Sequence, residues 1–467
     1  MRKTKIVCTM GPASESLEIV KKMLKSGMNV ARFNMSHGTH KYHKILIDNV
    51  KKAREELSLP CSIMIDLKGP EIRIRQFENG KVNLKAGAKF ILTTQNVLGT
   101  QEYVSVNYSK LPTILKSGDI ILLNDGLIEL KVLELNSTSV LTKVLVGGEL
   151  SNNKSINLPN INLQIPFLSE CDKKDIEFAR DVDADMISFS FVSTANDILN
   201  AKRFLHKIDF DDVMIISKIE NRFGTENIEE IVEVSDGVMV ARGDMGVEMD
   251  YVKIPAIQKK IISECNKKGK ISITATQMLE SMISSPRPTR AEISDVANAC
   301  IDGSTCVMLS GETSAGDYPV ESIVAMGKII EECEKSMPFP CIEKYKGGKD
   351  ISACIGNSAC DLAENLNASS ILVVTKTGKA AEGVSRFRPY AKIIACTPSY
   401  KTYNKLACLW GVYPIMDREF KSIDELLSSS KQKALSTKLV KKDEIFVEVT
   451  GIKAGESGVN LIRVDRY

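Results

Sequence analysis

The sequence predicts an α/β fold, a (β/α)8 TIM barrel with an inserted β-rich lid domain and a C-terminal open α/β domain. Three observations support this prediction. Eight short apolar runs are each followed by a segment with helical periodicity. One long interval between two of these runs alternates between apolar and polar residues with a period of two, and a new strand–helix pattern begins after about residue 340. Unusual polar residues end the apolar runs, at the positions where such a barrel keeps its active site.

The eight apolar runs are nearly continuous, which is typical of parallel strands that are buried on both faces. The amphipathic segments between them predict the helices that cover such a sheet. Eight strand–helix units favour a closed barrel over an open sheet. The predicted strands are Lys5–Met10, Val30–Ser36, Ser62–Leu67, Met186–Val192, Met214–Glu220, Gly237–Asp244, Ile271–Gln277 and Cys306–Glu312.

Residues 72–165 form the inserted domain, where the period of two and repeated turn signals predict antiparallel hairpins. An insertion at the rim of the barrel is well placed to close over the site and exclude water. Predicted turns lie at 78–80, 85–87, 116–119, 124–126 and 147–148. The predicted domains are 1–71 and 166–345 for the barrel, 72–165 for the lid and 346–467 for the C-terminal domain.

The C-terminal domain is predicted from one helix and three strands that follow a linker. The helix is expected at Ile351–Leu366, and the linker at Met337–Gly348. The strands are expected at Ser370–Thr375, Ala391–Thr397 and Glu444–Thr450.

Composition excludes several classes of protein. The chain has 467 residues, 43% of them hydrophobic, and its net charge of +3 gives no reason to expect nucleic-acid binding. No apolar stretch has the length of a membrane span, and the N-terminus enters a strand at once without a signal peptide. The 12 cysteines include no Cys-x-x-Cys pair, so reduced thiols and a cytoplasmic location are expected.

Lys218 and Glu220 lie at the end of one predicted strand, and Asp244 ends the next. Alternate residues of a strand share a face, so Lys218 and Glu220 point the same way. A lysine and two carboxylates at the ends of buried strands are too costly for packing alone. Two carboxylates suit a divalent metal ion, and a lysine beside them meets negative charge. The sequence therefore predicts an enzyme.

Six blocks in order along the chain closely resemble the pyruvate kinase family, and the resemblance runs over almost the whole length. The blocks are Ala31–Gly38 (ARFNMSHG), Asp66–Arg73 (DLKGPEIR), Ile216–Asn221 (ISKIEN), Met239–Glu248 (MVARGDMGVE), Thr274–Met282 (TATQMLESM) and Pro286–Asn298 (PRPTRAEISDVAN). The resemblance implies transfer of the phosphoryl group of phosphoenolpyruvate to ADP, with Mg²⁺ (or Mn²⁺) and K⁺, in a homotetramer. The composition predicts no membrane or nucleic-acid partner.

The resemblance also implies roles for individual residues. Glu220 and Asp244 match the Mg²⁺ ligands, and Lys218 and Arg32 match the cations beside the transferring phosphoryl group. The Gly243 and Asp244 amides match the substrate-carboxylate site, and Thr276 matches a threonine that takes part in protonating the enolate. The nucleotide set is Arg73, Lys154, Asn34, His37 and Asp125, with Pro12 and Tyr42 near the adenine and ribose. For Asp125, in Asn124-Asp-Gly126, a simple turn-forming role stays open.

Asn34, Ser36, Asp66 and the carbonyl of Leu67 match the family's K⁺ site, although position 67 is usually Thr. Family members with Glu at the position of Glu71 tend to need K⁺, whereas a Lys there can supply the positive charge itself, so the resemblance predicts K⁺ dependence. The loop Thr375, Lys376, Thr377, Gly378 and Lys379 matches the site of a phosphorylated effector such as fructose 1,6-bisphosphate or AMP, or is an ordinary strand–helix loop. Ala380 leaves the effector open, and Cys171, Ser193 and Phe223 are further departures from the family pattern.

Two alternatives are weaker. Another metal-dependent barrel acting on enolates, such as a phosphoenolpyruvate mutase or an aldolase-type lyase, explains Glu220 and Asp244 but not Arg73, Lys154 or the lid. A weakened paralogue that acts through binding alone is disfavoured by the intact Lys218 and Thr276.

Overall fold

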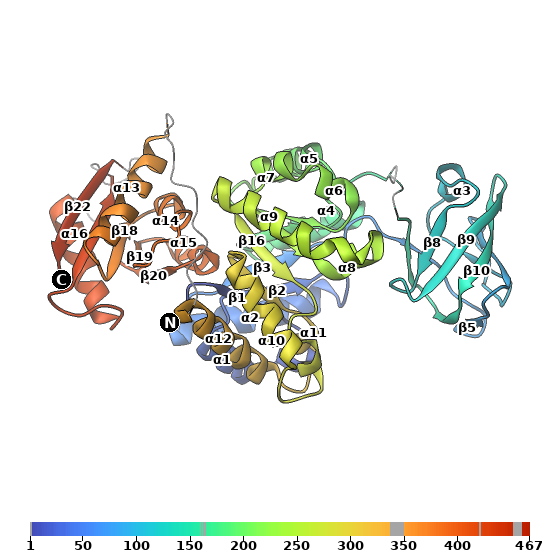
Figure 1. The fold of residues 1–467 in the computed structure, drawn as a ribbon, viewed down its shortest axis with the longest axis horizontal. Coiled ribbons are helices and arrows are strands. Elements are labelled where there is room, and N and C mark those ends of the chain that lie inside the picture. The colour runs from blue at the N-terminus through green and yellow to red at the C-terminus, as the bar shows by residue number, and fades with distance from the viewer. Residues whose placement is uncertain (1, 160, 162–164, 337–349, 420–421, 452–459) are drawn as a thin grey trace.

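The computed structural model describes residues 2–159, 161, 165–336, 350–419, 422–451 and 460–467. Three bodies lie in a row: a β-rich domain at one end, a barrel in the middle and an α/β domain at the other end (Figure 1). The polypeptide leaves the barrel after β3 to build the β-rich domain and then returns to complete the barrel.

The central body is a closed barrel of eight parallel strands, as the sequence predicts. Every residue of seven of these strands is buried, and the eighth has only its last residue partly exposed, which explains their nearly continuous apolar sequences. The strands are β1 (Lys5–Thr9), β2 (Val30–Asn34), β3 (Ser62–Asp66), β13 (Met186–Phe189), β14 (Met214–Ile219), β15 (Gly237–Ala241), β16 (Ile271–Ala275) and β17 (Cys306–Leu309).

Amphipathic helices surround the barrel, and local signals mark their ends. The hydroxyl of Ser16 accepts the N–H of Ile19 at the start of α1, and Gly27 ends it in the left-handed region. The barrel helices are α1 (Leu17–Ser26), α2 (His40–Leu57), α4 (Glu170–Asp181), α5 (Ala195–Lys207), α6 (Arg222–Glu226), α7 (Ile228–Val234), α8 (Arg242–Glu248), α9 (Ile254–Lys268), α10 (Arg290–Ile301), α11 (Gly311–Ser314) and α12 (Pro319–Ser336).

The β-rich domain has its own core around Phe90 and Leu130, separate from that of the barrel. Its main sheet runs in the order β4-β12-β8-β9-β10-β6-β7, and β11 pairs with β5 beside it. The elements are β4 (Ile72–Arg73), β5 (Lys81–Leu84), β6 (Lys89–Thr93), β7 (Tyr103–Ser105), α3 (Leu111–Ile114), β8 (Ile120–Leu123), β9 (Ile128–Leu135), β10 (Ser139–Val146), β11 (Gly148–Ser151) and β12 (Ser155–Asn157).

The C-terminal domain is a five-stranded sheet in the order β20-β19-β18-β21-β22, with only β22 antiparallel to its neighbour. Its elements are α13 (Ile351–Asn365), β18 (Ser370–Val374), α14 (Lys379–Ser385), β19 (Lys392–Thr397), α15 (Tyr400–Lys405), β20 (Val412–Met416), α16 (Ile423–Ser436), β21 (Ile445–Thr450) and β22 (Leu461–Arg466). The sequence did not predict the two edge strands: β20 contains Pro414, and three of the six residues of β22 are charged. The predicted linker Met337–Gly348 lies outside the described residues.

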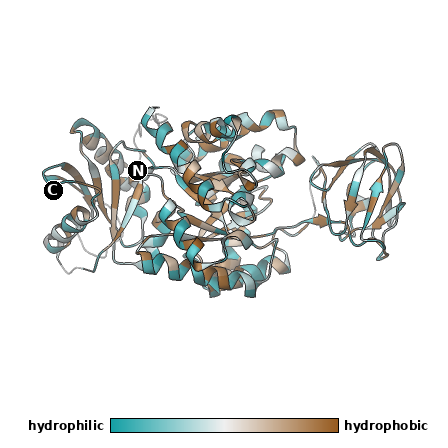
Figure 2. Ribbon diagram, turned by 90° about the horizontal axis from the view of Figure 1, so that it is seen from below, coloured by the Kyte–Doolittle hydropathy of each residue, from teal (hydrophilic) through white to brown (hydrophobic). Residues whose placement is uncertain are grey.

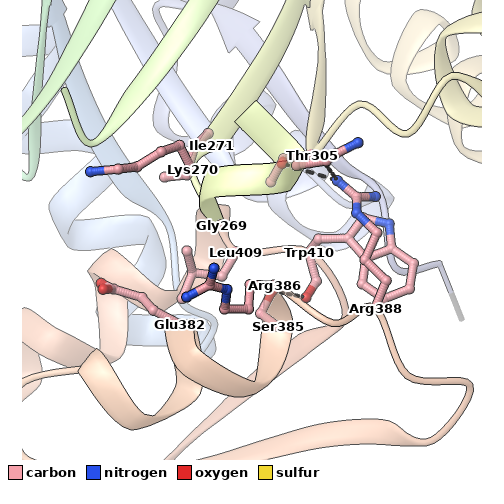
Figure 3. A pocket seen from close by; sticks show the side chains of 11 residues that line it. Gly269, Lys270, Ile271, Thr305, Glu382, Ser385, Arg386, Arg388, Leu409 and Trp410 are labelled. Atoms are coloured by element: carbon pink, nitrogen blue, oxygen red, sulfur yellow. Dashed lines mark hydrogen bonds between the residues drawn. The ribbon is translucent and has the colours of Figure 1, made fainter. Parts of the chain in front are cut away.

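The C-terminal domain covers the N-terminal ends of the barrel strands. Lys5 at the start of β1 donates to the carbonyl of Val412, 2.6 Å away, and Ser62 at the start of β3 donates to that of Asn404 at 2.7 Å. Arg388 donates to the carbonyl of Gly303 at 2.6 Å. The pocket beside this contact is lined by Asn266, Gly269, Lys270, Ile271, Thr305, Glu382, Ser385, Arg386, Arg388, Leu409 and Trp410 (Figure 3). The C-terminal ends of the barrel strands are not covered by the described part of this domain, and they are where the site residues lie.

Figure 2 shows the distribution of hydropathy in the three bodies. The strands inside the bodies carry many apolar residues, and the outer faces of the helices are mostly polar. In the part of the chain that the structure describes, no helix combines the length and the apolar character that crossing a membrane requires.

Candidate active site

Four side chains that the sequence assigns to catalysis or to metal binding meet at the C-terminal ends of the barrel strands. Arg32 lies on β2, Asp66 ends β3, Lys218 lies on β14, and Glu220 follows it directly. The parallel register aligns Asn34 with Asp66 across β2 and β3, so these strand ends lie on the same side of the barrel. Residues from distant parts of the sequence therefore share one site.

Lys218 is the centre of this group, and it is only 9% exposed. Its Nζ lies 2.9 Å from Oε1 of Glu220 and 3.4 Å from Oδ1 of Asp66, and it donates to Oγ of Ser190 at 2.7 Å. A buried ammonium with two carboxylates and a hydroxyl around it is held in one position. Its direction toward Glu220 agrees with the predicted shared face.

The three charges change one another's pKa. Burial opposes the charge on Lys218, but Asp66, Glu220 and Asp244 outweigh burial and raise its pKa above the ordinary value. Burial likewise opposes ionisation of Asp66, but Lys218 and Arg32 together lower its pKa. For Glu220, burial raises the pKa to about 7, Asp244 adds to this effect, and Lys218 opposes it. Lys218 is therefore charged at physiological pH, beside an ionised Asp66.

Arg32 is fixed by two neighbours and is 8% exposed. Its Nε donates to Oδ2 of Asp66 at 2.7 Å, its Nη2 contacts the same carboxylate, and its Nη1 donates to Oγ1 of Thr9 at 2.9 Å. Asp66 thus lies between Arg32 and Lys218 and orients both. Two oriented cations from different strands, at the same end of the barrel, suit an anion that carries several charges.

Ser188 and Ser190 belong to the site, although sequence reasoning missed them. Ser188 donates to Oδ1 of Asp66 at 2.7 Å, and Ser190 accepts from Lys218 and donates to the carbonyl of Leu67 at 2.7 Å. Both hydroxyls are buried at the end of β13. Their spacing of two in an otherwise apolar run (Met186-Ile-Ser-Phe-Ser) was the signal that could have identified them.

Asp244 lies on the short helix α8, directly after β15, and its side chain is exposed. The N–H of Gly243, predicted to receive the substrate carboxylate, donates to Oγ1 of Thr276 at 2.8 Å. The hydroxyl of Thr276 in turn donates to the carbonyl of Ala275 at 2.7 Å. Thr276 has a φ of 65°, in the left-handed region that a β-branched residue rarely adopts. α8 and the end of β16 therefore meet at a strained, hydrogen-bonded turn.

Arg242 holds this turn in place, and it too was missed by the sequence analysis. Its Nη2 donates to the carbonyl of Thr276 at 2.6 Å, its Nε donates to that of Ala275 at 3.1 Å, and its Nη1 pairs with Asp295 at 2.7 Å. The guanidinium therefore links α8, the end of β16 and α10. Because it follows the apolar run Gly237–Ala241 directly, its position was a visible signal.

Glu220 and Asp244 are the carboxylates available to a divalent cation. Each raises the pKa of Lys218, and the charge of Asp244 raises the pKa of Glu220, so both carboxylates act on the same buried lysine. Among the described residues, no three His, Cys, Asp or Glu side chains gather into a metal-binding group. Two carboxylates with open positions fit Mg²⁺, which keeps waters and substrate oxygens among its ligands.

The four residues predicted for K⁺ lie at the ends of β2 and β3. Oδ1 of Asn34 accepts the N–H of Ser36 at 3.1 Å, and the carbonyl of Leu67 accepts from Ser190. Asp66 is wholly buried and already bonded to Arg32 and Ser188. The oxygen atoms of this set therefore lie in one neighbourhood, beside the two cations of the site.

Arg73 and Lys154 lie where the lid joins the barrel. Nε of Arg73 donates to Glu71 at 2.7 Å, and its Nη1 donates to the carbonyl of Asn153 at 2.7 Å. Arg73 pairs in register with Ser155, next to Lys154 in the chain. The antiparallel pairing of β4 and β12 thus brings the outgoing and returning chains of the lid together.

Asp125 lies at a lid turn where Asn124 and Asp125 both have positive φ, 53° and 56°. Its carboxylate accepts a hydrogen bond of 2.9 Å from Ser155, and it is exposed. The backbone supports the turn-forming interpretation and leaves the carboxylate near β12. His37, Pro12 and Tyr42 lie on the barrel rim, where His37 and Pro12 are exposed and Tyr42 donates to Glu15 at 2.6 Å.

The predicted effector loop joins β18 to α14. Oγ1 of Thr375 accepts the N–H of Gly378 at 2.9 Å, and Gly378 has a φ of 92°, which favours glycine. Lys376 pairs with Glu419 at 2.8 Å, so its charge is partly neutralised, whereas Thr377 and Lys379 are exposed.

Comparison with known proteins covers nearly the whole chain. Residues 1–323 match the family model described as pyruvate kinase, barrel domain, and residues 354–465 match pyruvate kinase, alpha/beta domain. The chain is 44% identical to a pyruvate kinase of Clostridium acetobutylicum, over 99% of each chain. It is 42% identical to a pyruvate kinase of Sporosarcina psychrophila, over 99% of this chain and 80% of that protein. A crystal structure of a pyruvate kinase from Cryptosporidium parvum superimposes with a TM-score of 0.93 at 36% identity, covering 100% of this chain and 96% of the other.

Proposed function

The chain belongs to the pyruvate kinase family, and from this premise we propose that its barrel site transfers the phosphoryl group of phosphoenolpyruvate to ADP, giving pyruvate and ATP. The chain is an enzyme, a phosphotransferase. The observation that carries the proposal is the position of Lys218, buried between Glu220 and Asp66 at the open end of the barrel. A fixed cation there meets the negative charge that moves during phosphoryl transfer.

Glu220 and Asp244 would hold Mg²⁺ or Mn²⁺. A bound divalent ion supplies positive charge to the phosphate and carboxylate oxygens of the substrate. Burial raises the pKa of Glu220 and the charge of Asp244 adds to this effect, which supports the assignment because a bound cation would favour the ionised carboxylates.

Lys218 and Arg32 would carry the phosphoryl charge. The ammonium of Lys218 is held by Asp66 and Ser190. The guanidinium of Arg32 is held by Asp66 and Thr9. Neither cation therefore needs to reorganise during the reaction. Lys218 would stabilise the negative charge that develops on the enolate oxygen, and Arg32 would hold the phosphoryl oxygens.

Asn34, Ser36, Asp66 and the Leu67 carbonyl would form the K⁺ site. A monovalent cation there adds charge beside the phosphate, which Glu71 does not supply. Leu67 would contribute its main-chain carbonyl oxygen. This ligand does not depend on the side chain, so it is kept although the usual threonine hydroxyl is missing.

Arg73 and Lys154 would bind the phosphates of ADP, with Asp125 approaching from the lid and Asn34 and His37 from the barrel. Guanidinium and ammonium groups suit phosphate. Closure of the lid would bring these groups over the site and exclude water.

Thr276 would act in protonation of the enolate. Its hydroxyl bridges the Gly243 amide and the Ala275 carbonyl, so it lies beside the loop that would receive the substrate carboxylate. A hydroxyl is a weak acid, so a water molecule would complete the proton path.

The loop Thr375–Lys379 would bind a phosphorylated effector through Lys379 and the hydroxyls of Thr375 and Thr377. We place the enzyme in the cytoplasm as a homotetramer, in line with the family. Among the described residues the cysteines are free, which supports a reducing compartment.

One coupled assay tests the proposed function. Purified protein is given phosphoenolpyruvate, ADP and Mg²⁺, and pyruvate is measured with and without K⁺ and with added sugar phosphates. Pyruvate formation that needs both substrates supports the proposal. Turnover of phosphoenolpyruvate without ADP would point to a mutase or lyase, and binding without turnover to a paralogue that only binds.

A further inference from the structure

One hydrogen bond joins the lid to the helix that carries Asp244. Nδ2 of Asn157 donates to Oε1 of Glu248 at 2.8 Å. Asn157 is the last residue of β12, where the lid returns to the barrel, and Glu248 is the last residue of α8. Figure 1 shows α8 as the barrel helix that faces the lid.

On the lid side, β12 (Ser155–Asn157) lies next to the lid residues that the proposed function assigns to ADP. It lies between β4 and β8, and its first residue, Ser155, pairs in register with Arg73. The same Ser155 donates to the carboxylate of Asp125 at 2.9 Å, and Lys154 precedes it directly. A shift of β12 therefore moves Arg73, Lys154 and Asp125 together.

On the barrel side, α8 carries Gly243 and Asp244. The helix has only seven residues, and its first turn is tied to the barrel by Arg242 and Thr276. Glu248 and Asp244 lie one turn apart in the same helix, so a displacement of Glu248 also displaces Asp244.

The surroundings of Glu248 mark this contact as more than a surface pair. Burial raises the pKa of Glu248, the charge of Asp244 raises it further, and the Asn157 hydrogen bond lowers it. In the described chain, no lysine or arginine forms an ion pair with Glu248, so the neutral donor Asn157 is its partner. Beside it, Gly126 of the lid turn lies against Val247. A Cβ atom placed on Gly126 would lie 3.6 Å from Cγ1 of Val247.

We propose that the Asn157–Glu248 hydrogen bond sets the position of the lid over the barrel and couples the nucleotide-binding residues of the lid to Asp244. Both are positioning residues, because they act through Arg73, Lys154, Asp125 and Asp244. This proposal rests on the proposed function, and it assigns to the pair the task of aligning ADP with the metal and the substrate.

Variants that reverse the hydrogen bond test this role. Asn157→Asp places a carboxylate against Glu248, so the two should repel and displace the lid. Glu248→Gln keeps an acceptor oxygen for Asn157 and should behave nearly as the wild type. In the double variant N157D/E248Q, the glutamine amide donates to the new carboxylate and restores the bond with its direction reversed.

The expected kinetic result is selective for the nucleotide. Asn157→Asp should raise KM for ADP by roughly tenfold to a hundredfold, because contacting residues couple that strongly. KM for phosphoenolpyruvate should change little, and the double variant should recover most of the loss. Asn136→Asp is the matched control, because it adds the same charge at an exposed lid turn between β9 and β10.

Small-angle scattering gives a readout that needs no turnover. Asn157→Asp should broaden the distribution of lid positions, and N157D/E248Q should restore it, even if the chemistry of the site were misassigned. The proposal is overturned if the double variant is no better than Asn157→Asp. It is also overturned if both KM values rise equally, or if scattering of Asn157→Asp matches that of the wild type.

Discussion

Nζ of Lys218 lies 2.9 Å from Oε1 of Glu220, two residues further along the same chain segment. A strand directs both side chains to one face, and the barrel buries both at its open end. The pair therefore combines a cation for the phosphoryl group with a proposed metal ligand in one local stretch. Asp66, 3.4 Å from Lys218, joins this stretch to Arg32 on another strand.

Lys218→Met should lower pyruvate formation by about a thousandfold or more, because the fixed charge beside the transferring group is lost. Lys218 lies at the end of its strand and is not one of the apolar residues of the barrel core, so circular dichroism should show the same secondary structure. Lys44→Met, at an exposed position on α2, is the control. A folded Lys218→Met variant with wild-type turnover would contradict the role.

Glu220→Gln should raise the Mg²⁺ concentration needed for half-maximal activity by about tenfold or more, because the amide is a weaker ligand than a carboxylate. Chelation should abolish wild-type activity, and added Mg²⁺ or Mn²⁺ should restore it. The measurement is a metal titration of pyruvate formation. Glu226→Gln, exposed on α6, serves as the control, and an unchanged titration curve for the Glu220→Gln variant would refute the assignment.

Thr276→Val and Thr276→Ser separate shape from chemistry. Valine keeps the shape of threonine but cannot accept the Gly243 N–H or transfer a proton, so proton exchange at the methyl carbon of pyruvate should slow by about a hundredfold or more. Serine keeps the hydroxyl and should retain most of the exchange. Nuclear magnetic resonance in heavy water measures this step alone. Equal exchange rates for the two variants would argue against a part in protonation.

Glu71→Lys should weaken the dependence on K⁺, because a lysine places a fixed positive charge near the predicted site. Turnover is compared in K⁺ and in tetramethylammonium, and the ratio should fall toward one in this variant. Glu71→Gln adds no cation and should keep the dependence. If the wild type turns over equally in both salts, the prediction of K⁺ dependence is wrong.

Lys5→Met tests the buried amine between the barrel and the C-terminal domain. Burial lowers the pKa of Lys5 to about 8, from an ordinary 10.5. Below pH 8 the amine is charged in both states, so the cost of burying its charge is present in full. Between pH 8 and pH 10.5 the amine of Lys5 keeps its proton in the unfolded chain but has lost it in the folded protein. The free energy of unfolding therefore rises with pH over this range, by on the order of 3 kcal/mol.

The wild type should therefore gain stability over the Lys5→Met variant as pH rises from 8 to 10.5. Urea denaturation of both proteins at the two ends of this range measures the change, with Lys25→Met on the surface as the control. A difference that stays constant with pH would contradict the low pKa.

Much of the fold was readable from the chain because its signals are local. The continuous apolar runs identified all eight barrel strands, and the family blocks led to the fold that the structure confirms. The edge strands β20 and β22 were not predicted. A proline in β20 and charged side chains in β22 remove the local strand signal, and the pairing of these strands depends on the neighbouring strands of the sheet. Of the site residues named from the sequence, Arg32, Asp66, Lys218 and Glu220 gather at the strand ends, and the roles of all of them stay predictions.

The sequence by itself determined the family, the order of the domains and the shared face of Lys218 and Glu220, because each of these follows from local patterns along the chain. Only the tertiary structure decided that Asp66 lies between Lys218 and Arg32, that Ser188 and Ser190 complete this group, and that Asn157 reaches Glu248. These contacts join distant segments, and their geometry depends on barrel register and on domain placement, which no local pattern contains.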